Sequence, residues 1–316
     1  MFKNQARCQL PLGNWRSLTD IRSWPKAACP IAPTLDNRLS EVHHQWVYTE
    51  FFGLAEVPFR ITPDPRFLWY SPQHRDVKAK IIHHIQTRKG PVYTFADVGT
   101  GKTSIAKRVR EELSEDKTKQ VVFAFAPNLR TSNAFLRFVM DEFGVKTDRN
   151  YAVSLKNFEQ YLVNQYQAGV SPVLLVDEAQ NVTLDMLRLI HHLFNFSTNT
   201  EFLVQVALFG QNELHDKIKH YESLRSRMRP ARLKAFDLEE TRQMMDFRWH
   251  VAGGTGLPFN QEAIGEVFRL TGGNPREICK LCDATLLRAF VDQRSAIDRD
   301  TVLAAASDAF VAEENR

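Results

Sequence analysis

Two hydrophobic periods alternate through the middle of the chain. Short runs of apolar residues indicate strands, and the segments between them carry apolar residues at helical spacing. A chain in which strands alternate with helices predicts βαβ units and a parallel sheet with helices on both faces. The expected strands lie at 92–95, 121–126, 173–176 and 202–209, and the expected helices at 73–88, 103–113, 132–143, 154–168 and 183–196.

The strand pattern stops near residue 237, and four helical patterns follow. Asn260 and Asp298 stand where N-caps are expected, and paired glycines at 253–254 and 272–273 separate helices. We therefore expect an α/β domain at 48–236 and a small all-α domain at 237–316. The four helices are expected at 239–251, 260–270, 275–290 and 298–310.

Residues 1–47 show neither period but contain several prolines and the tryptophans Trp15, Trp24 and Trp46. This segment is interpreted as an N-terminal arm. Two interpretations stay open: a disordered extension, or an arm that docks on a partner or a neighbouring subunit because three tryptophans expose much apolar surface.

Composition limits the class of protein. With 316 residues, 43% of them hydrophobic and 25% charged, the chain is of a globular type. No apolar run approaches the roughly 18 residues that cross a bilayer, and the first 25 residues lack the apolar core of a secretory signal. A cytoplasmic protein with no membrane partner is expected. The C-x-x-C at Cys279 and Cys282 is interpreted as a reduced, half-buried helix face in preference to zinc, because no second ligand pair accompanies it.

The net charge of +4 is unevenly distributed. Residues 1–47 hold six basic and three acidic side chains, so +3 of the charge lies there and the other 269 residues are nearly neutral. Bulk electrostatics therefore gives no argument that the main body binds nucleic acid.

The strongest chemical motif is A-D-V-G-T-G-K-T at 96–103, between an expected strand and an expected helix. In this setting a phosphate loop wraps a triphosphate with backbone N–H groups, Lys102 reaches the β and γ phosphates, and the Thr103 hydroxyl holds Mg²⁺. Ala96 departs from the pattern, which has glycine there. The expected ATP-binding residues are Asp97, Val98, Gly99, Thr100, Gly101, Lys102, Thr103 and Ser104.

A second motif, P-V-L-L-V-D-E-A-Q at 172–180, fits a buried strand that delivers two carboxylates at its carboxyl end. Asp177 is expected to anchor Mg²⁺ through its water shell, and Glu178 to orient and polarise the attacking water. Gln211, after the fourth apolar run, is expected to contact the γ phosphate or the water. Asn212 is the alternative, and for either residue a simple cap of the next helix stays open.

Arginines complete the expected catalytic set. Arg225, Arg227, Arg229 and Arg232 form a cluster, and an arginine supplied by a neighbour accelerates phosphoryl transfer by about 10³ to 10⁵. A solvated basic face is the alternative. Arg276, in T-G-G-N-P-R, is expected to approach the γ phosphate from the same subunit.

These motifs resemble the AAA+ ATPases, in particular the group with ExeA, TniB and TnsC, from about residue 48 to residue 312. T-P-D-P-R-F-L at 62–68 and G-G-N-P-R-E-I-C-K-L-C-D at 272–283 are more specific than the nucleotide motifs. The resemblance implies an AAA+ P-loop fold with a helical lid domain and a segment at 50–68 that borders the adenine. It also implies Walker A at Lys102 and Thr103, Walker B at Asp177 and Glu178, sensor one at Gln211, the arginine finger at Arg227, with Arg225 and Arg229 open, and sensor two at Arg276.

The resemblance implies two competing functions. TnsC and TniB relatives regulate cut-and-paste transposition: with ATP they polymerise on duplex DNA, and they link a TniQ-like target selector to the transposase. ExeA relatives assemble a secretion port and continue into a membrane helix and a peptidoglycan-binding region. Because this chain stops at Arg316, the transposition function is favoured. A slow nucleotide-gated adaptor is a third possibility.

The expected mechanism is an ATP-dependent, head-to-tail ring or filament around duplex DNA. DNA would be gripped through its phosphates and without sequence reading. The candidate DNA contacts are Asn128, Arg130, Thr131, Lys146, Thr147 and Arg149.

Overall fold

The computed structural model describes residues 48–62, 64–125, 129 and 131–314, with side chains as far as Asp308. The expected arm at 1–47 and the candidate DNA contacts Asn128 and Arg130 lie outside the described residues.

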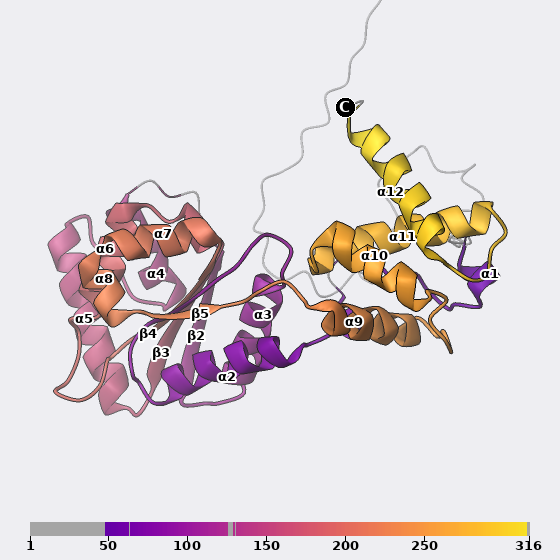
Figure 1. The fold of residues 1–316 in the computed structure, drawn as a ribbon. Helices are drawn as coiled ribbons and strands as arrows, with labels where there is room; N and C mark the ends of the chain where they lie inside the picture. The colour runs from indigo at the N-terminus through magenta and orange to yellow at the C-terminus, as the bar shows by residue number, and fades with distance from the viewer. Residues whose placement is uncertain (1–47, 63, 126–128, 130, 315–316) are drawn as a thin grey trace, which may run out of the picture. The chain divides into compact units, whose positions relative to one another are not determined.

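Five parallel strands form one sheet in the order β2-β3-β4-β1-β5 (Figure 1). This arrangement confirms the α/β fold with a parallel sheet. Phe125 pairs with Asp177, and Phe95 pairs with Gly210, so the carboxyl ends of neighbouring strands meet at one edge. The strands are β1 (Val92–Phe95), β2 (Lys119–Phe125), β3 (Ser171–Asp177), β4 (Gln205–Gly210) and β5 (Arg229–Arg232).

The sequence did not predict β5 or the short helix α8 (Glu222–Arg227) before it. β5 reads R-P-A-R, and only Ala231 in it is buried. As an edge strand it needs no apolar run, and proline is tolerated because its missing N–H faces away from the sheet. Charged residues also discourage another chain from pairing with the edge. Arg229 and Arg232 therefore belong to a strand of the sheet and not to a loop.

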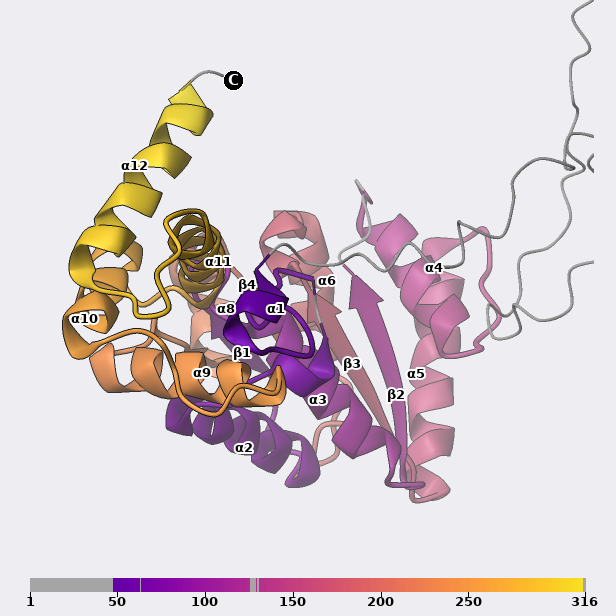
Figure 2. The same cartoon turned by 90° about the vertical axis from the view of Figure 1, so that its right-hand side faces the viewer.

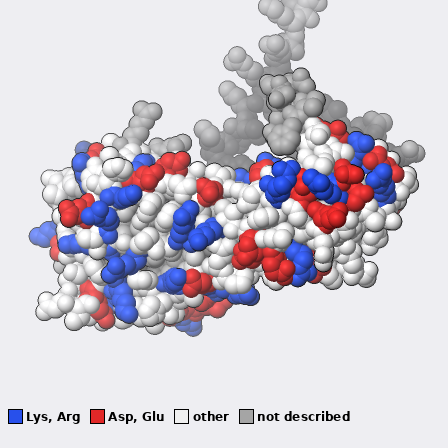
Figure 3. Space-filling view, viewed as in Figure 1, with Lys and Arg blue, Asp and Glu red and all other residues white. Residues whose placement is uncertain are grey.

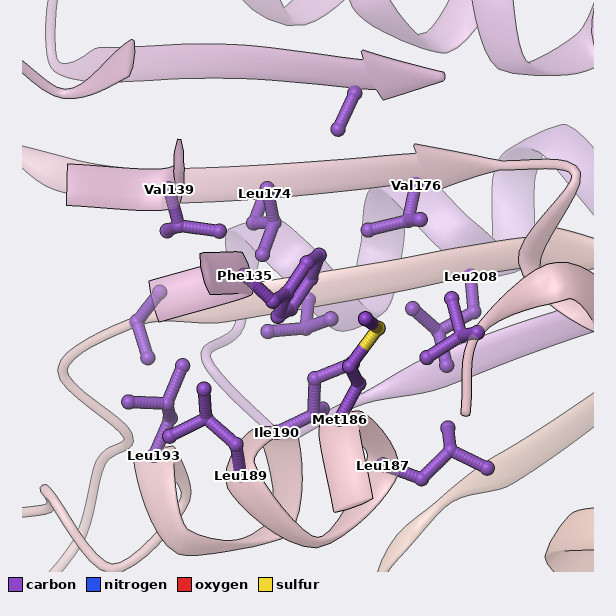
Figure 4. Packing of buried hydrophobic residues seen from close by; sticks show 14 of the residues in the cluster. Phe135, Val139, Leu174, Val176, Met186, Leu187, Leu189, Ile190, Leu193 and Leu208 are labelled. Carbon is purple, nitrogen blue, oxygen red and sulfur yellow. The ribbon is translucent and has the colours of Figure 1, made fainter. Parts of the chain in front are cut away.

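Both faces of the sheet are covered by helices, as expected (Figure 2). On one face, Val173 and Leu175 of β3 pack in a cluster with residues of α2 (Pro72–Gln86) and α3 (Lys102–Ser114). On the other, Leu174 and Val176 pack with residues of three further helices, as Figure 4 shows for part of that cluster. Alternate residues of β3 thus enter two separate cores, the mark of a strand buried on both faces. The three helices are α4 (Ser132–Glu142), α5 (Tyr151–Gln167) and α6 (Leu184–Leu193); α7 (Asn212–His220) follows β4.

Four helices form the C-terminal bundle: α9 (Leu238–Val251), α10 (Gln261–Thr271), α11 (Pro275–Val291) and α12 (Arg299–Glu314). Their starts follow capping rules. Asp237 and Glu240 form a capping box, and Asn260 and Asp298 accept bonds from the backbone N–H groups of Ala263 and Thr301, so both predicted caps are confirmed.

The bundle core also contains residues from the start of the described chain. Tyr48, Phe59 and Phe67 are buried with Met245 and Trp249. Phe59 and Phe67 lie in the segment at 50–68, which contains most of α1 (Thr49–Phe52) and the 3₁₀ turn η2 (Pro65–Phe67). The segment expected to border the adenine therefore packs against the helical bundle. None of the described helices is both long and apolar enough to cross a bilayer.

Gly273 allows the bundle to contact the segment that precedes α9. The N–H of Phe236 donates to the carbonyl of Gly273 at 2.9 Å. Gly273 has φ of 72°, and a Cβ placed on it would lie 1.9 Å from the Phe236 carbonyl oxygen. Only glycine fits there without a backbone shift.

We expect Gly273→Ala to destabilise the protein more than Gly272→Ala. Gly272 also has a positive φ, of 59°, but nothing lies within 4 Å of a Cβ placed on it, so its substitution should cost only the left-handed strain of about 1–2 kcal/mol. The clash at Gly273 should add roughly 1–3 kcal/mol. Urea unfolding of both variants measures the difference, and equal losses would contradict the close contact.

Candidate functional site

The loop at 96–101 joins β1 to α3 at the carboxyl edge of the sheet. Gly99 and Gly101 have φ of 84° and 99°, which lets the backbone turn sharply into the helix. Gly101 is the N-cap of α3 and offers no capping side chain, so the first N–H groups of the helix are left for an anion. Thr100 Oγ1 braces the turn by donating to the Asp97 carbonyl at 2.8 Å.

Lys102 folds back over this loop. Its Nζ donates to the carbonyls of Ala96 at 3.0 Å and Asp97 at 2.6 Å, and its side chain is buried. Burial lowers the pKa of Lys102, while the charges of Glu178, Asp177 and Asp97 oppose the shift. A phosphate would give this ammonium a charged acceptor in place of two neutral carbonyls, and charge-assisted bonds are the stronger kind.

Asp177 ends β3 and is 1% exposed. One carboxylate oxygen accepts from the N–H of Glu178 at 2.9 Å, and the nearby Thr103 side chain acts to lower the pKa of the carboxyl. Its other oxygen, Oδ2, is buried and has no partner. Burial raises the pKa of this carboxyl, so an ionised Asp177 is costly unless a cation or water meets it.

The unpartnered carboxylate oxygen of Asp177 fits a site for Mg²⁺, because a buried acceptor of this kind needs a cation or water. Asp177 and Thr103 supply the hard oxygen donors that Mg²⁺ prefers. These two residues would hold the ion, directly or through its water shell, and a bound Mg²⁺ neutralises phosphate charge.

Glu178 follows at a strained position. Its φ is 52°, a left-handed conformation that is uncommon for a residue with a side chain. The 3₁₀ turn η3 (Ala179–Asn181) begins directly after it. Glu178 Oε2 accepts a hydrogen bond of 2.5 Å from Gln180 Nε2. Its carboxylate is close enough to Lys102 and Asp177 for charge interactions with both.

Gln211 lies beyond the end of β4 and is the N-cap residue of α7, but its side chain makes no capping bond. The capping alternative therefore does not describe its side chain. Asn212 instead donates from Nδ2 to the Asp97 carboxylate at 2.6 Å. The Asn212 amide thus contacts the loop, and the roles of Gln211 and Asn212 toward the γ phosphate stay predictions.

The start of α11 lies against the same loop. Asn274 Nδ2 donates to the Val98 carbonyl at 2.7 Å, and its Oδ1 caps the N–H of Arg276 at 3.0 Å. A Cβ on Gly99 would come within 2.6 Å of Asn274 Oδ1 and 2.8 Å of Arg276 Cβ. The Cβ of Arg276 therefore lies beside the loop, and its approach to the γ phosphate stays a prediction. Asn274 was missed, although an Asn before Pro at a helix start was a visible cap signal.

His74 was also missed as a support of the loop. Its ring is buried, with Nε2 3.0 Å from the Thr100 carbonyl and Nδ1 2.8 Å from Ser71 Oγ. A carbonyl can only accept, so Nε2 carries the proton and the Ser71 hydroxyl donates to Nδ1 of a neutral ring. A Cβ on Gly101 would lie 2.8 Å from Nε2. The ring thus fills the space below the loop.

Arg227 is remote from this loop in its own chain. It is exposed at the end of α8 and donates to Asn195 Oδ1 at 2.9 Å. It also lowers the pKa of His191 on α6, after burial, which has the larger effect. Arg225 and Arg229 are likewise exposed. Among the described residues, therefore, the chain does not bring its predicted finger to its own site.

The described DNA candidates lie on either side of α4. Thr131 is its N-cap and accepts from the Ala134 N–H at 3.2 Å, while Lys146, Thr147 and Arg149 lie between α4 and α5. Lys146 and Arg149 are exposed, and neither forms an ion pair within the described part of the chain. On the face in Figure 3, basic side chains are mixed with acidic ones and form no continuous basic patch.

Cys279 and Cys282 are both buried in the bundle core, which corrects their interpretation as a half-buried face. Cys279 Sγ accepts a bond from Arg248, and burial raises the pKa of both thiols.

We expect His74 to make folding stability depend on pH. Burial lowers the pKa of His74. As pH falls through about 6.5, His74 is therefore protonated in the unfolded chain but stays neutral in the folded protein. Its contribution is complete above that pH and is lost as pH falls toward the lowered pKa. Urea unfolding at pH 7.5 and 5.5 should show a smaller loss for His74→Gln than for the wild type. His84 and His191 titrate in both proteins, and equal losses would contradict this assignment.

The chain is similar to known proteins in sequence and in fold. The family described as "AAA domain" matches residues 85–218. "General secretion pathway protein A" of Aeromonas hydrophila is 32% identical over 250 residues, which cover 77% of this chain but only 45% of that protein. The chain thus spans less than half the length of this curated relative.

Solved structures with a similar fold include Cdc6p from Pyrobaculum aerophilum, with a TM-score of 0.58 at 14% identity over 79% of this chain and 70% of that one. The Drosophila ORC bound to DNA gives 0.57 at 17% identity over 80% and 64%. At these identities the likeness concerns the fold alone. The chain has the fold of AAA+ P-loop ATPases, and the matched domain and the relative support an AAA+ ATPase.

Proposed function

We propose that this protein binds ATP with Mg²⁺ at the loop and hydrolyses it to ADP and phosphate. The unpartnered Oδ2 of Asp177 carries this proposal. It is a buried acceptor without a hydrogen-bond partner, and Thr103 and Lys102 lie close to the same carboxylate. Such a set suits a cation next to a phosphate and has no evident structural use.

Each residue has a proposed role. Lys102 and Arg276 bind phosphate oxygens, and the N–H groups at the start of α3 bind them from the backbone. Glu178 orients the attacking water and draws its proton, while Gln211 senses the γ phosphate. His74 and Asn274 each hold a backbone carbonyl of the loop, those of Thr100 and Val98.

The remaining charge compensation comes from a second copy. Arg227 is exposed and its bonds lie away from the loop of its own chain, so we assign it to a neighbour's site. A surface that gives a finger and a different surface that receives one make a heterologous, head-to-tail contact. Such contacts close into a ring or continue as a filament. Hydrolysis that waits for this contact is slow in the isolated subunit.

We expect Lys102→Ala and Glu178→Gln to separate binding from hydrolysis. Removing the ammonium should weaken ATP binding by roughly 10- to 100-fold. Glu178→Gln should keep normal binding and lower kcat by about 10² to 10⁴. A fluorescent ATP analogue and phosphate release measure the two effects. A Glu178→Gln protein with wild-type turnover would refute the proposed role.

Mixing variants tests whether Arg227 acts between subunits. Arg227→Ala and Glu178→Gln should each be inactive alone, but a mixture should recover activity because Glu178→Gln subunits still present Arg227 to intact sites. At a one-to-one ratio about a quarter of the head-to-tail sites are complete. The same mixing with Arg225→Ala and with Arg229→Ala identifies the finger, and no recovery with any of them would refute the shared site.

For the biological role we propose, from the motifs at 62–68 and 272–283, a regulator of TnsABC-type cut-and-paste transposition. In this proposal ATP-bound copies assemble on duplex DNA and connect a TniQ-like target selector to the transposase. The 32% identity to General secretion pathway protein A favours a second candidate, a role in secretion assembly.

DNA binding distinguishes the two roles. If the loop after α4 faces DNA, Lys146→Ala with Arg149→Ala should weaken duplex binding with an ATP analogue and flatten its salt dependence. Lys107→Ala with Lys117→Ala removes the same charge from exposed positions elsewhere and should change neither. Wild-type protein that assembles with nucleotide but ignores duplex DNA would support the secretion role.

A further inference from the structure

We infer that Gln180 is a positioning residue for Glu178, and that it couples this carboxylate to the end of β4 where Gln211 lies. The inference rests on the proposed hydrolysis. Gln180 is half-buried in η3, two residues after Glu178, and the catalytic roles assigned above do not use it.

The Gln180 amide bridges two parts of the site. Its Nε2 donates to Glu178 Oε2 at 2.5 Å, and its Oε1 accepts from the backbone N–H of Gln211 at 3.1 Å. A backbone N–H can only donate, so it fixes the oxygen of the amide on its own side and turns the NH₂ group toward the carboxylate. The Gln211 N–H and the Glu178 carboxylate, which can only accept, thus select the same orientation of the Gln180 amide.

The backbone of the turn is anchored to the same helix that follows Gln211. Lys217 of α7 donates from Nζ to the carbonyls of Gln180 at 2.5 Å and Val182 at 3.1 Å. At the other end of the contact, a Cβ on Gly210 would lie 3.0 Å from the Gln180 backbone nitrogen. The backbone of η3 is thus held against both β4 and α7.

This bridge has a direct consequence for Glu178. The bond to Oε2 restrains a side chain whose backbone is already in a left-handed conformation, and the other oxygen, Oε1, stays available for water. A displacement of Gln211 would reach Glu178 through a single amide. In this way the state of the γ-phosphate side of the site sets the orientation of the base.

Two variants divide the bridge into its halves. Gln180→Ala removes both bonds. Gln180→Glu keeps an oxygen for the Gln211 N–H but places a carboxylate against Glu178. Asn181→Ala is the matched control, because Asn181 is exposed in the same turn and its side chain has no hydrogen bond to Glu178. The measurements are kcat, the Kd of a fluorescent ATP analogue, and hydrogen exchange of the Gln211 amide in nucleotide-free protein.

Both Gln180 variants should lower kcat by about ten-fold, since part of the contribution of a general base depends on its placement. The Kd for nucleotide should stay within about two-fold, because no phosphate contact is lost. Exchange of the Gln211 amide should be about five-fold faster in Gln180→Ala and unchanged in Gln180→Glu. Asn181→Ala should match the wild type throughout.

Unchanged or higher kcat in either variant would overturn the inference. So would a rise in Kd as large as the fall in kcat, or unchanged Gln211 exchange in Gln180→Ala. Failure of the proposed hydrolysis looks different: the wild type would then release no phosphate, or Glu178→Gln would release it at the wild-type rate.

Discussion

The parallel register of the sheet brings the carboxyl ends of β1, β3 and β4 to one edge, and the site depends on this alignment. Each strand is only four to seven residues long and buried on both faces, so hydrophobic packing fixes where it ends. The residue after each strand then has little freedom of position. Lys102, Asp177 and Gln211 are far apart in the chain, yet they are held by the same two cores that stabilise the sheet.

At that edge the protein carries unfavourable electrostatics. Lys102 is buried against neutral carbonyls, and Asp177 keeps an unpartnered oxygen. Burial lowers the pKa of Lys102 and raises that of Asp177, so it favours the neutral form of each group. The attraction between the charges of Lys102 and Asp177 offsets only part of this effect of burial. Packing in the rest of the fold must offset this cost, because burial keeps both groups from water. A site of this kind is preorganised for a charged ligand rather than formed by it.

Sequence reasoning found what short segments encode. The glycine loop, the Asp-Glu pair and the helix caps are local patterns, and the first three predicted strands have enough apolar residues to be seen. β5 was missed because an edge strand needs no apolar run. His74, Asn274 and Gln180 were missed as parts of the site for another reason: each acts on a backbone group at least 26 residues away, and no local pattern records such a partner.

Gly273 and Asn274 are consecutive residues with different attachments. Gly273 accepts from the backbone of Phe236, whose ring lies 5.5 Å from that of His74, and Asn274 bonds to the Val98 carbonyl. The segment that precedes α9 and the loop at 96–101 are therefore contacted by two consecutive residues. No long series of side-chain contacts separates these two attachments. A shift at the start of α11 would therefore move both attachments together.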